Sequence, residues 1–396
     1  MSASPYRTWR TYSATIGGQS YEVATKPGTF AQGRLDPAAL LLAEHTKVAS
    51  GDCVVHLNCG NGLTGAVAAK AAPDVRVYLC DRNVVSTEAA RRTLDANGIA
   101  SGDVLLGHGT HVLPADLRAD SVVIRIPPER VALLQLLMDA FSILKDGGRC
   151  YIAGATNEGI KTAANTIETI FGNARVLARD SSHRVIVAAR RTTEPALPDG
   201  VDVAMLDSNS FRDVNVTLRG HAYRLCSRPG VFSWEHLDEA TSILADVMEI
   251  RDGDTVLDLG CGSGALGIVA SSLTSGRITM VDADIEAVRS ATRTAEANGL
   301  TNWRALASDV AGAVLDERFD VVVTNPPFHV GKATDLDVPL QFIIDAHDVL
   351  APGGRMFLVA NRTLPYEQAV KHRFGNVSNL HDGPRFKVLT AVRANG

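Results

Sequence analysis

The chain of 396 residues resembles itself at an offset of about 202 residues. The similar segments keep their order and spacing in the two halves. They pair residues 21–36 with 223–238, 51–69 with 253–271, 80–99 with 281–300, 122–129 with 321–328, and 143–154 with 349–360. Solenoid repeats have periods of roughly 20–50 residues, so this longer period indicates a duplicated domain. We therefore expect two copies of one fold.

A short polar segment separates the two copies. Residues 190–202 read "RRTTEPALPDGVD", with two prolines and few large apolar side chains, as is typical of a linker. We expect the first copy to span residues 1–190 and the second copy 203–396, with a linker at 191–202.

Each copy alternates strand and helix patterns. In the second copy, "TVLDL" leads into glycines and a helix from about Ala265, and "RITMVD" precedes an amphipathic helix that stops near Gly299. Such alternation predicts right-handed βαβ crossovers, and therefore an α/β fold with a mostly parallel, twisted sheet and helices on both faces. The last strand pattern, "RFKVLTAV" (385–392), follows the preceding one without a long helix, so we expect a C-terminal antiparallel hairpin.

The composition argues against a membrane, a disulfide framework and a metal site. No apolar run reaches the about eighteen residues of a membrane span, and the N-terminus lacks the apolar core of a secretory signal. The six cysteines show no metal-ligand spacing and mostly lie in apolar runs. We expect reduced thiols, no metal and a cytoplasmic protein.

The charge is distributed unevenly between the halves. The net charge is −5, with 21 basic and 19 acidic residues in 1–200 and with 18 basic and 25 acidic residues in 201–396. An RNA partner would need a local basic patch, and this distribution favours the first half for it.

A glycine loop follows the first strand of the second copy. "LDLGCGSGALG" (257–267) contains the pattern GxGxxG, which alone also suits a nicotinamide-dependent dehydrogenase. With Asp258 and Gly260 the pattern becomes DxGxGxG, which resembles the first motif of class I S-adenosylmethionine (SAM) methyltransferases. In that family the loop packs against the methionine moiety and the ribose. The alternative for Asp258 is a strand-end residue that only hydrogen-bonds loop amides.

Two more acidic residues follow strands of the second copy. Asp282 ends the second strand, where a carboxylate accepts hydrogen bonds from ribose hydroxyls in either nucleotide-binding fold. Asp309 follows the third strand, at the position that meets the adenine amine in the SAM family. The alternative for Asp309 is a helix N-cap.

The fourth strand ends in "VVVTNPPFH" (321–329). The carboxamide oxygen of Asn325 and the carbonyl of Pro326 provide two acceptors that hold an amine with its lone pair directed at a methyl donor. The prolines fix the backbone, and Phe328 offers a face for base stacking. The alternative is a turn that only ends a strand. For His329 we favour a turn residue or phosphate contact over a base.

These motifs together resemble the bacterial ribosomal RNA guanine-N2 methyltransferases of the RsmC/RlmG type. The resemblance rests on "NPPFH", "RPGVFSWEHLD", "LDLGCGSG" and the ending "NRTLPYEQAVKHRFGNVSNLHDGPRFKVLTA". It covers essentially the whole chain, because that family is also a tandem pair with a degenerate first copy. "NPP" with an aromatic residue alone would equally suit DNA adenine-N6 or protein glutamine-N5 methyltransferases.

The resemblance implies two Rossmann-like class I methyltransferase domains and SAM-dependent methylation of a guanine N2 amine in ribosomal RNA. The residues implied to hold SAM are Asp258, Gly260, Cys261, Gly262, Gly264, Asp282 and Asp309. The implied catalytic residues are Asn325, Pro326 and Phe328, and the implied substrate contacts are Phe328, His329, Phe232 and Arg228. The partner would be ribosomal RNA or a ribosomal subunit, and the fused copies are compatible with a monomer. The alternatives are methylation of a protein glutamine or another nucleic-acid amine, and a non-catalytic RNA-binding or ribosome-assembly module.

The first copy differs at the chemical positions. Asp258, Gly260, Asn325 and Phe328 correspond to His56, Asn58, Ile126 and Glu129, whereas Gly60, Gly62 and Asp81 are retained. Because isoleucine accepts no hydrogen bond, we expect this copy to be catalytically inactive. Our hypothesis is that it stabilises the second copy and helps to hold RNA.

Overall fold

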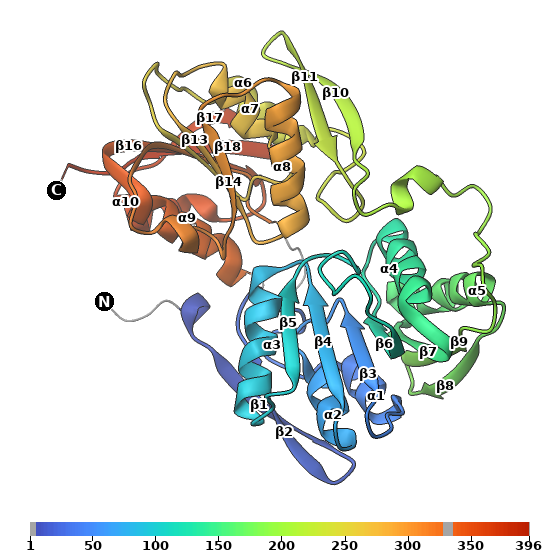
Figure 1. Cartoon of the computed structure of the whole chain (residues 1–396). Helices are drawn as coiled ribbons and strands as arrows, with labels where there is room; N and C mark the ends of the chain where they lie inside the picture. The colour runs from blue at the N-terminus through green and yellow to red at the C-terminus, as the bar shows by residue number, and fades with distance from the viewer. Residues whose placement is uncertain (1–4, 328–335, 396) are drawn as a thin grey trace. The chain divides into compact units, whose positions relative to one another are not determined.

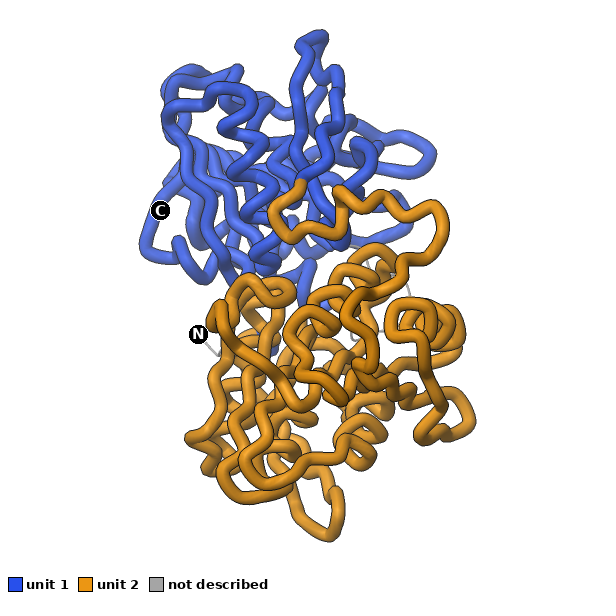
Figure 2. The backbone as a smooth tube through the Cα atoms, turned by 45° about the vertical axis from the view of Figure 1, so that its right-hand side comes forward, with its two compact units in different colours: residues 1–6, 211–396 blue, residues 7–210 orange. Residues whose placement is uncertain are grey.

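The computed structural model describes residues 5–327 and 336–395. The chain forms two compact units (Figure 2). The N-terminal unit comprises residues 7–210, and the C-terminal unit comprises residues 1–6 and 211–396. The segment expected as a linker, 191–202, therefore belongs to the N-terminal unit, and the start of the chain belongs to the C-terminal unit.

The N-terminal unit is built on a seven-stranded sheet with the order β5-β4-β3-β6-β7-β9-β8 (Figure 1). Its strands are β3 (Cys53–Leu57), β4 (Arg76–Asp81), β5 (Gly102–Leu106), β6 (Ala119–Arg125), β7 (Leu144–Ala155), β8 (Arg175–Arg179) and β9 (His183–Ala189). Strands β3 to β7 pair in parallel, and β9 is antiparallel to both β7 and β8. The helices are α1 (Pro37–His45), α2 (Leu63–Ala71), α3 (Val84–Ala96), α4 (Arg130–Ile143) and α5 (Ile160–Phe171), and a separate hairpin is formed by β1 (Arg10–Ile16) and β2 (Gln19–Thr25).

The C-terminal unit repeats this topology with the order β14-β13-β12-β15-β16-β18-β17. Its strands are β12 (Val256–Leu259), β13 (Ile278–Asp282), β14 (Trp303–Ala307), β15 (Phe319–Thr324), β16 (Leu350–Asn361), β17 (Ser378–Asp382) and β18 (Phe386–Val392). The helices are α6 (Glu239–Val247), α7 (Ala265–Ser271), α8 (Ile285–Ala297), α9 (Asp337–Val349) and α10 (Tyr366–Phe374), and a hairpin of β10 (Arg212–Leu218) and β11 (His221–Ser227) precedes them.

Both faces of each sheet are covered by apolar packing. In β15, Val321 and Val323 belong to one buried cluster, whereas Val322 belongs to the other. Successive strand residues point to opposite faces of a sheet, so this alternation shows two cores, one on each face. The near-continuous apolar strands of the sequence reflect this double burial.

The predicted fold class and the C-terminal hairpin are confirmed, with two local differences. The hairpin pairs β18 with β17, and a nine-residue helix, α10, lies between β16 and β17. Neither this helix nor the hairpin β10–β11 was predicted from the sequence. The strands of that hairpin are mostly exposed or half-buried in their first residues, so they lack a strong apolar pattern.

Three further observations bear on ligands and environment. Among the helices of the described residues, none is long and apolar enough to cross a membrane. In the same residues, no cluster of three or more His, Cys, Asp or Glu side chains is arranged to hold a metal ion. All six cysteines have free thiols, and only Cys53 is not fully buried.

Candidate functional site

The glycine loop connects β12 to α7 and has room for a ligand beside it. Gly260 and Gly264 have φ values of 78° and 84°, and a Cβ atom on them would lie 2.8 Å from the Phe342 ring and 3.1 Å from the Ala291 Cα. These two glycines are therefore required by packing as well as by φ. Gly262, with φ of 53°, has no atom within 4 Å of the Cβ position, so the space there is open.

Asp258 is fully buried at the end of β12. Its Oδ2 accepts a hydrogen bond of 2.8 Å from the Gly267 N–H, and its Oδ1 has no hydrogen-bond partner among the described residues. Burial raises the pKa of this carboxyl to about 7; the Gly267 N–H opposes the shift and the charge of Asp282 adds to it. A buried acceptor with no partner is rare in folded proteins. It fits a cationic group of a ligand, such as an α-ammonium.

Asp282 ties the glycine loop to β13. Its Oδ2 accepts from the Gly262 N–H at 2.9 Å, and its Oδ1 accepts from the Asp284 N–H at 2.9 Å. In the N-terminal unit, Asp81 accepts from the Gly60 N–H at the same distance. The link is therefore a feature of the fold in both copies. Since each carboxylate oxygen can accept more than one hydrogen bond, it is compatible with additional ribose contacts.

Cys261 lies within the loop and is buried. Its N–H and that of Gly260 both donate to the Val281 carbonyl, which fixes the loop against β13. Burial holds the pKa of the Cys261 thiol well above its usual value, so we assign this side chain a packing role.

Asp309 follows β14 and binds a residue that sequence reasoning missed. Its Oδ1 accepts a hydrogen bond of 2.5 Å from the Tyr6 hydroxyl. Tyr6 is 3% exposed and packs in a core cluster of the C-terminal unit with Val310 and Leu259. A separation of 303 residues and the absence of any motif around Tyr6 explain why no sequence pattern indicated this pair.

The turn after Asp309 is strained and held in place. Val310 has φ of 53°, a value that is costly for a β-branched residue. Gly109 occupies the equivalent position of the N-terminal copy with φ of 66°. The next amide, of Ala311, donates to the Asp345 carboxylate on α9 at 3.2 Å. Strain of this kind concentrates at functional sites, which agrees with a ligand-binding role for this turn.

Asn325 lies directly after β15 and has its carboxamide oriented by α6. Its Nδ2 donates to Asp238 Oδ2 at 3.0 Å and to Thr241 Oγ1 at 2.9 Å. Asp238 is the N-cap of α6 and also accepts from the Thr241 N–H. Because the nitrogen is committed to these acceptors, the oxygen is presented on the other side of the amide. Sequence reasoning assigned no role to Asp238 and Thr241, although an Asp at a helix start is a recognisable N-cap signal.

The structure describes only some of the other residues that are implied to be catalytic or to contact the substrate. Pro326 is buried and Pro327 is exposed. Phe328 and His329 lie outside the described residues. Phe232 is 65% exposed, so its ring is accessible to a partner.

The structure does not support the substrate contact that the resemblance implies for Arg228. The Arg228 side chain is 0% exposed and its Nε lies 2.9 Å from Glu286 Oε2, which is also 0% exposed. The guanidinium further stacks on the Phe211 ring at 5.6 Å. A buried charge requires such a partner, so Arg228 links β11 and its following turn to α8 and does not reach solvent.

In the N-terminal copy, an ion pair occupies the place that corresponds to Asn325 and Asp238. Asp36 occupies the place of Asp238, and its Oδ2 binds Arg125 Nε at 2.8 Å. Arg125 also binds Glu158 at 2.7 Å and stacks on the Phe30 ring. Ile126, at the place of Asn325, is 4% exposed. At this place the N-terminal copy therefore has no carboxamide oxygen to accept from an amine, and its two carboxylates are already bound by Arg125.

The cofactor positions of the N-terminal copy are altered in the same way. His56 replaces Asp258 and is buried, and this burial lowers the pKa of its imidazole to about 3. It is therefore neutral at physiological pH and provides no anion. His108 stands at the position of Asp309 and lies 3.2 Å from Gln135 Oε1.

Comparison with known proteins agrees with the duplicated architecture. The model of the methyltransferase small domain family matches residues 20–187 and again residues 222–390. The ribosomal RNA small subunit methyltransferase C of Hahella chejuensis is 33% identical over 283 residues, which cover 71% of this chain and 80% of that protein. Its namesake from Shewanella pealeana is 31% identical over 294 residues, with coverages of 72% and 81%.

One solved structure is similar over nearly the whole chain. It is the T. thermophilus 16S rRNA N2 G1207 methyltransferase (RsmC) in complex with AdoMet and guanosine. It has a TM-score of 0.82 and 30% sequence identity, and the match covers 98% of this chain and 99% of that one. Both domains of the present chain are thus represented in that protein.

Proposed function

Because the chain belongs to the methyltransferase small domain family, we propose that it transfers a methyl group from SAM to the exocyclic N2 amine of a guanine in ribosomal RNA. The observation that carries this proposal is the orientation of Asn325, whose nitrogen is bound by Asp238 and Thr241. Its oxygen is therefore an acceptor at the carboxyl edge of the sheet, where ligands bind in open α/β folds. The names of the relatives and the guanosine in the similar structure support the same substrate.

The residues around the glycine loop fit SAM. Asp258 Oδ1 is a buried acceptor with no described partner, and the space beside Gly262 is open. Asp282 and Asp309 would hold the ribose and the adenine amine, respectively. When bound, SAM supplies an electrophilic methyl group on a sulfonium, so the chain has to orient the acceptor amine and does not need to provide a strong base.

The role of the chain is to orient the guanine amine. The lone pair of this amine is delocalised into the ring, and the amine is therefore a weak nucleophile. The Asn325 oxygen and the Pro326 carbonyl accept its two N–H groups, which turns the lone pair out of conjugation and favours the positive charge that develops on nitrogen. Neither acceptor is a base, so the displaced proton leaves to solvent.

A guanine within RNA has to leave its stack to reach this site. Phe328 is proposed to stack on the extruded base. His329, which follows it in the sequence, is proposed to contact a phosphate of the RNA. Phe232 offers a second exposed aromatic ring. Base–aromatic stacking contributes roughly 1–3 kcal/mol per base, which offsets part of the unstacking cost.

We assign catalysis to the C-terminal copy alone. The N-terminal copy has no side-chain amide at the place of Asn325, and Arg125 binds the carboxylate that corresponds to Asp238. It also has two histidines in place of Asp258 and Asp309. It is proposed to stabilise the catalytic copy and to help bind RNA.

The test is incubation of the full-length protein with methyl-labelled SAM and ribosomal RNA, either naked or in small subunits, followed by nucleoside analysis. We expect label in N2-methylguanosine, and loss of that label with the Asn325→Ala variant. Label confined to protein would contradict the proposal and favour glutamine methylation. Absence of transfer to every substrate, with intact RNA binding, would favour a non-catalytic module.

A further inference from the structure

The N-terminal unit has a hollow of about 320 Å³ that the catalytic function does not use. It lies over the strands β7, β8 and β9 and the segment after α1. Four cationic side chains line it: Lys47, Arg149, Arg175 and Arg191. The other lining residues are uncharged, so the hollow contains positive charge without any carboxylate.

In the part of the chain that the structure describes, these four cations have no acidic partner. Within residues 5–327 and 336–395, none of them forms an ion pair with a carboxylate. Neighbouring basic residues do: Lys145 binds Asp120 at 2.8 Å, and Arg190 lies 3.4 Å from Asp146. Uncompensated like charges repel one another, and a bound anion relieves that repulsion.

The C-terminal copy shows that the fold does not require this charge. By position in the repeat, Lys47, Arg175 and Arg191 correspond to Glu249, Ser378 and Ala394. Arg149 corresponds to Arg355, which forms an ion pair with Asp254. The equivalent surface of the C-terminal copy therefore has one cation, and that cation is neutralised.

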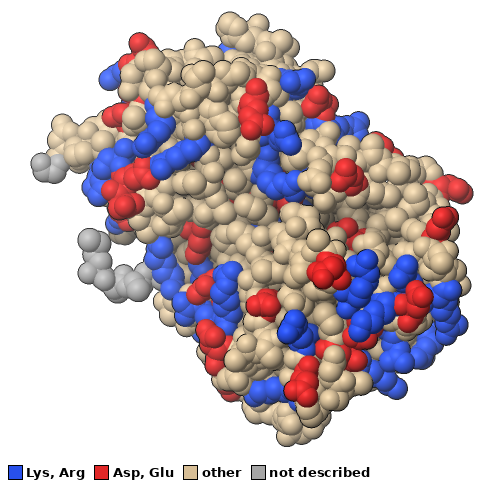
Figure 3. All heavy atoms as spheres, viewed as in Figure 1, with Lys and Arg blue, Asp and Glu red and all other residues tan. Residues whose placement is uncertain are grey.

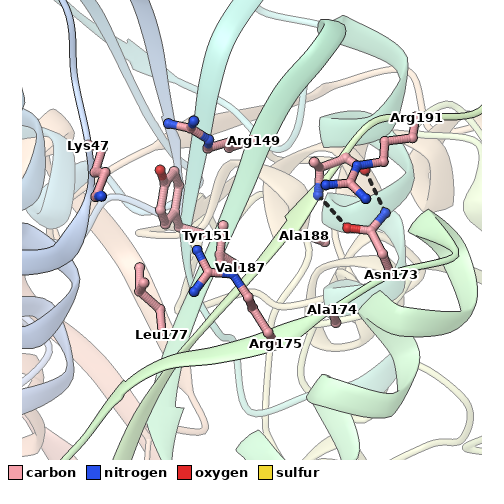
Figure 4. A pocket seen from close by; sticks show the side chains of 11 residues that line it. Lys47, Arg149, Tyr151, Asn173, Ala174, Arg175, Leu177, Val187, Ala188 and Arg191 are labelled. Carbon is pink, nitrogen blue, oxygen red and sulfur yellow. Dashed lines mark hydrogen bonds between the residues drawn. The ribbon is translucent and has the colours of Figure 1, made fainter.

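The hollow has a defined wall and floor (Figure 4). Lys47, Arg149 and Arg175 surround Tyr151, which is 1% exposed and forms the floor. The Asn173 carboxamide bonds both backbone groups of Ala189, with its Nδ2 donating to the carbonyl at 2.8 Å and its Oδ1 accepting from the N–H at 3.0 Å. These two hydrogen bonds fix the start of β8 against β9, and they therefore position Arg175.

The basic surface extends beyond the hollow. In the space-filling view, Lys and Arg side chains gather over the region of β7, β8 and β9 (Figure 3). Arg179, at the end of β8, is exposed, and Arg184 on β9 is half-buried. An extended cationic surface favours an extended polyanion over a single small anion.

We propose that this hollow binds backbone phosphates of the RNA substrate. Guanidinium groups bind phosphate oxygens through paired hydrogen bonds, and the three cations around Tyr151 match closely spaced phosphates. The identity of the polyanion rests on the proposed function, whereas the presence of an anion site rests on the charges alone. The site gives the inactive copy a role in holding RNA.

The experiment compares two triple variants of the full-length protein. Lys47→Ala/Arg149→Ala/Arg175→Ala removes the cations around Tyr151. The control, Lys70→Ala/Arg91→Ala/Arg118→Ala, removes three exposed cations of the same unit that do not line the hollow. Dissociation constants for ribosomal RNA are measured by filter binding at several salt concentrations. Chemical denaturation checks the folding of the N-terminal unit, and SAM affinity by calorimetry checks that the catalytic unit is intact.

We expect the hollow variant to bind RNA about tenfold more weakly at low salt, given the size of exposed ion contacts. The plot of the log of its association constant against the log of salt concentration should be shallower, with the magnitude of the slope reduced by about 2, for three phosphate contacts to single-stranded RNA. The control should retain the wild-type affinity and slope, and both variants should bind SAM normally. Equal behaviour of the two variants would overturn the proposal.

The outcome is separable from that of the proposed function. Methylation of guanine by the wild type with an unchanged hollow variant would refute only the phosphate site. A weakened hollow variant of a protein that methylates no guanine would refute only the reaction.

Discussion

Replacing Asn325 by aspartate tests which atom of the carboxamide faces α6. In the structure, Nδ2 lies 3.0 Å from Asp238 Oδ2 and 2.9 Å from Thr241 Oγ1. The substitution places an oxygen of almost the same size and shape where the nitrogen stood. Two carboxylates then face each other, and two hydrogen bonds lose their donor.

The expected cost depends on pH. At about 3 Å and an effective dielectric constant of about 20, the repulsion is about 5 kcal/mol; partial exposure of both groups reduces this value. Binding of one proton by the pair relieves the repulsion. The folded variant therefore takes up a proton more readily than its unfolded chain, so its free energy of unfolding rises as pH falls, by at most about 1.4 kcal/mol per pH unit.

The assay is chemical denaturation between pH 5 and about pH 9. Asn325→Ala loses the same hydrogen bonds without adding charge, and we expect a pH-independent cost of about 1–2 kcal/mol. Asn302→Asp is the matched control, because among the described residues the Asn302 amide donates only to the Ser275 carbonyl. A cost of Asn325→Asp that equals that of the alanine variant at every pH would refute the assigned orientation.

Three other predictions follow from single contacts. Tyr6→Phe should raise the dissociation constant for SAM about three- to tenfold in calorimetry, because the Asp309 carboxylate loses the hydroxyl that positions it; unchanged affinity would contradict that role. Asp258 has a pKa of about 7 in place of 3.8, so the unfolding free energy should fall as pH rises from about 4 to 7; Asp258→Asn should remove this dependence in denaturation experiments. Arg125→Ala should cost about 3–5 kcal/mol, since Asp36 and Glu158 lose their buried partner, whereas Arg118→Ala should leave the denaturation midpoint unchanged.

The sequence predicted the features that depend on local pattern. The offset of the repeat indicated two copies, and alternation of apolar strands with helices indicated the parallel sheet. The glycines of the loop were recognisable because packing against Phe342 and Ala291 excludes side chains at Gly260 and Gly264. The strand ending at Asn325 was recognisable because prolines do not continue a sheet.

Contacts between distant segments were not predictable from the sequence. Tyr6 donates a hydrogen bond to Asp309, which is 303 residues away in the sequence, and Arg228 forms an ion pair with Glu286 on α8. For Arg228, a surface position was the natural expectation, because arginine is rarely fully buried without a partner. The cationic hollow combines Lys47, Arg149 and Arg175 from three separate segments, and only the tertiary fold brings them together.

The orientation of Asn325 toward the substrate is tested most directly by a crystal structure of the protein with S-adenosylhomocysteine and guanosine. We predict that Asn325 Oδ1 lies within about 3.2 Å of the guanine N2 atom, a normal hydrogen-bond distance. We also predict that Nδ2 keeps its contacts with Asp238 and Thr241. Guanosine bound elsewhere, or Asn325 turned so that Nδ2 faces the base, would contradict the proposed reaction.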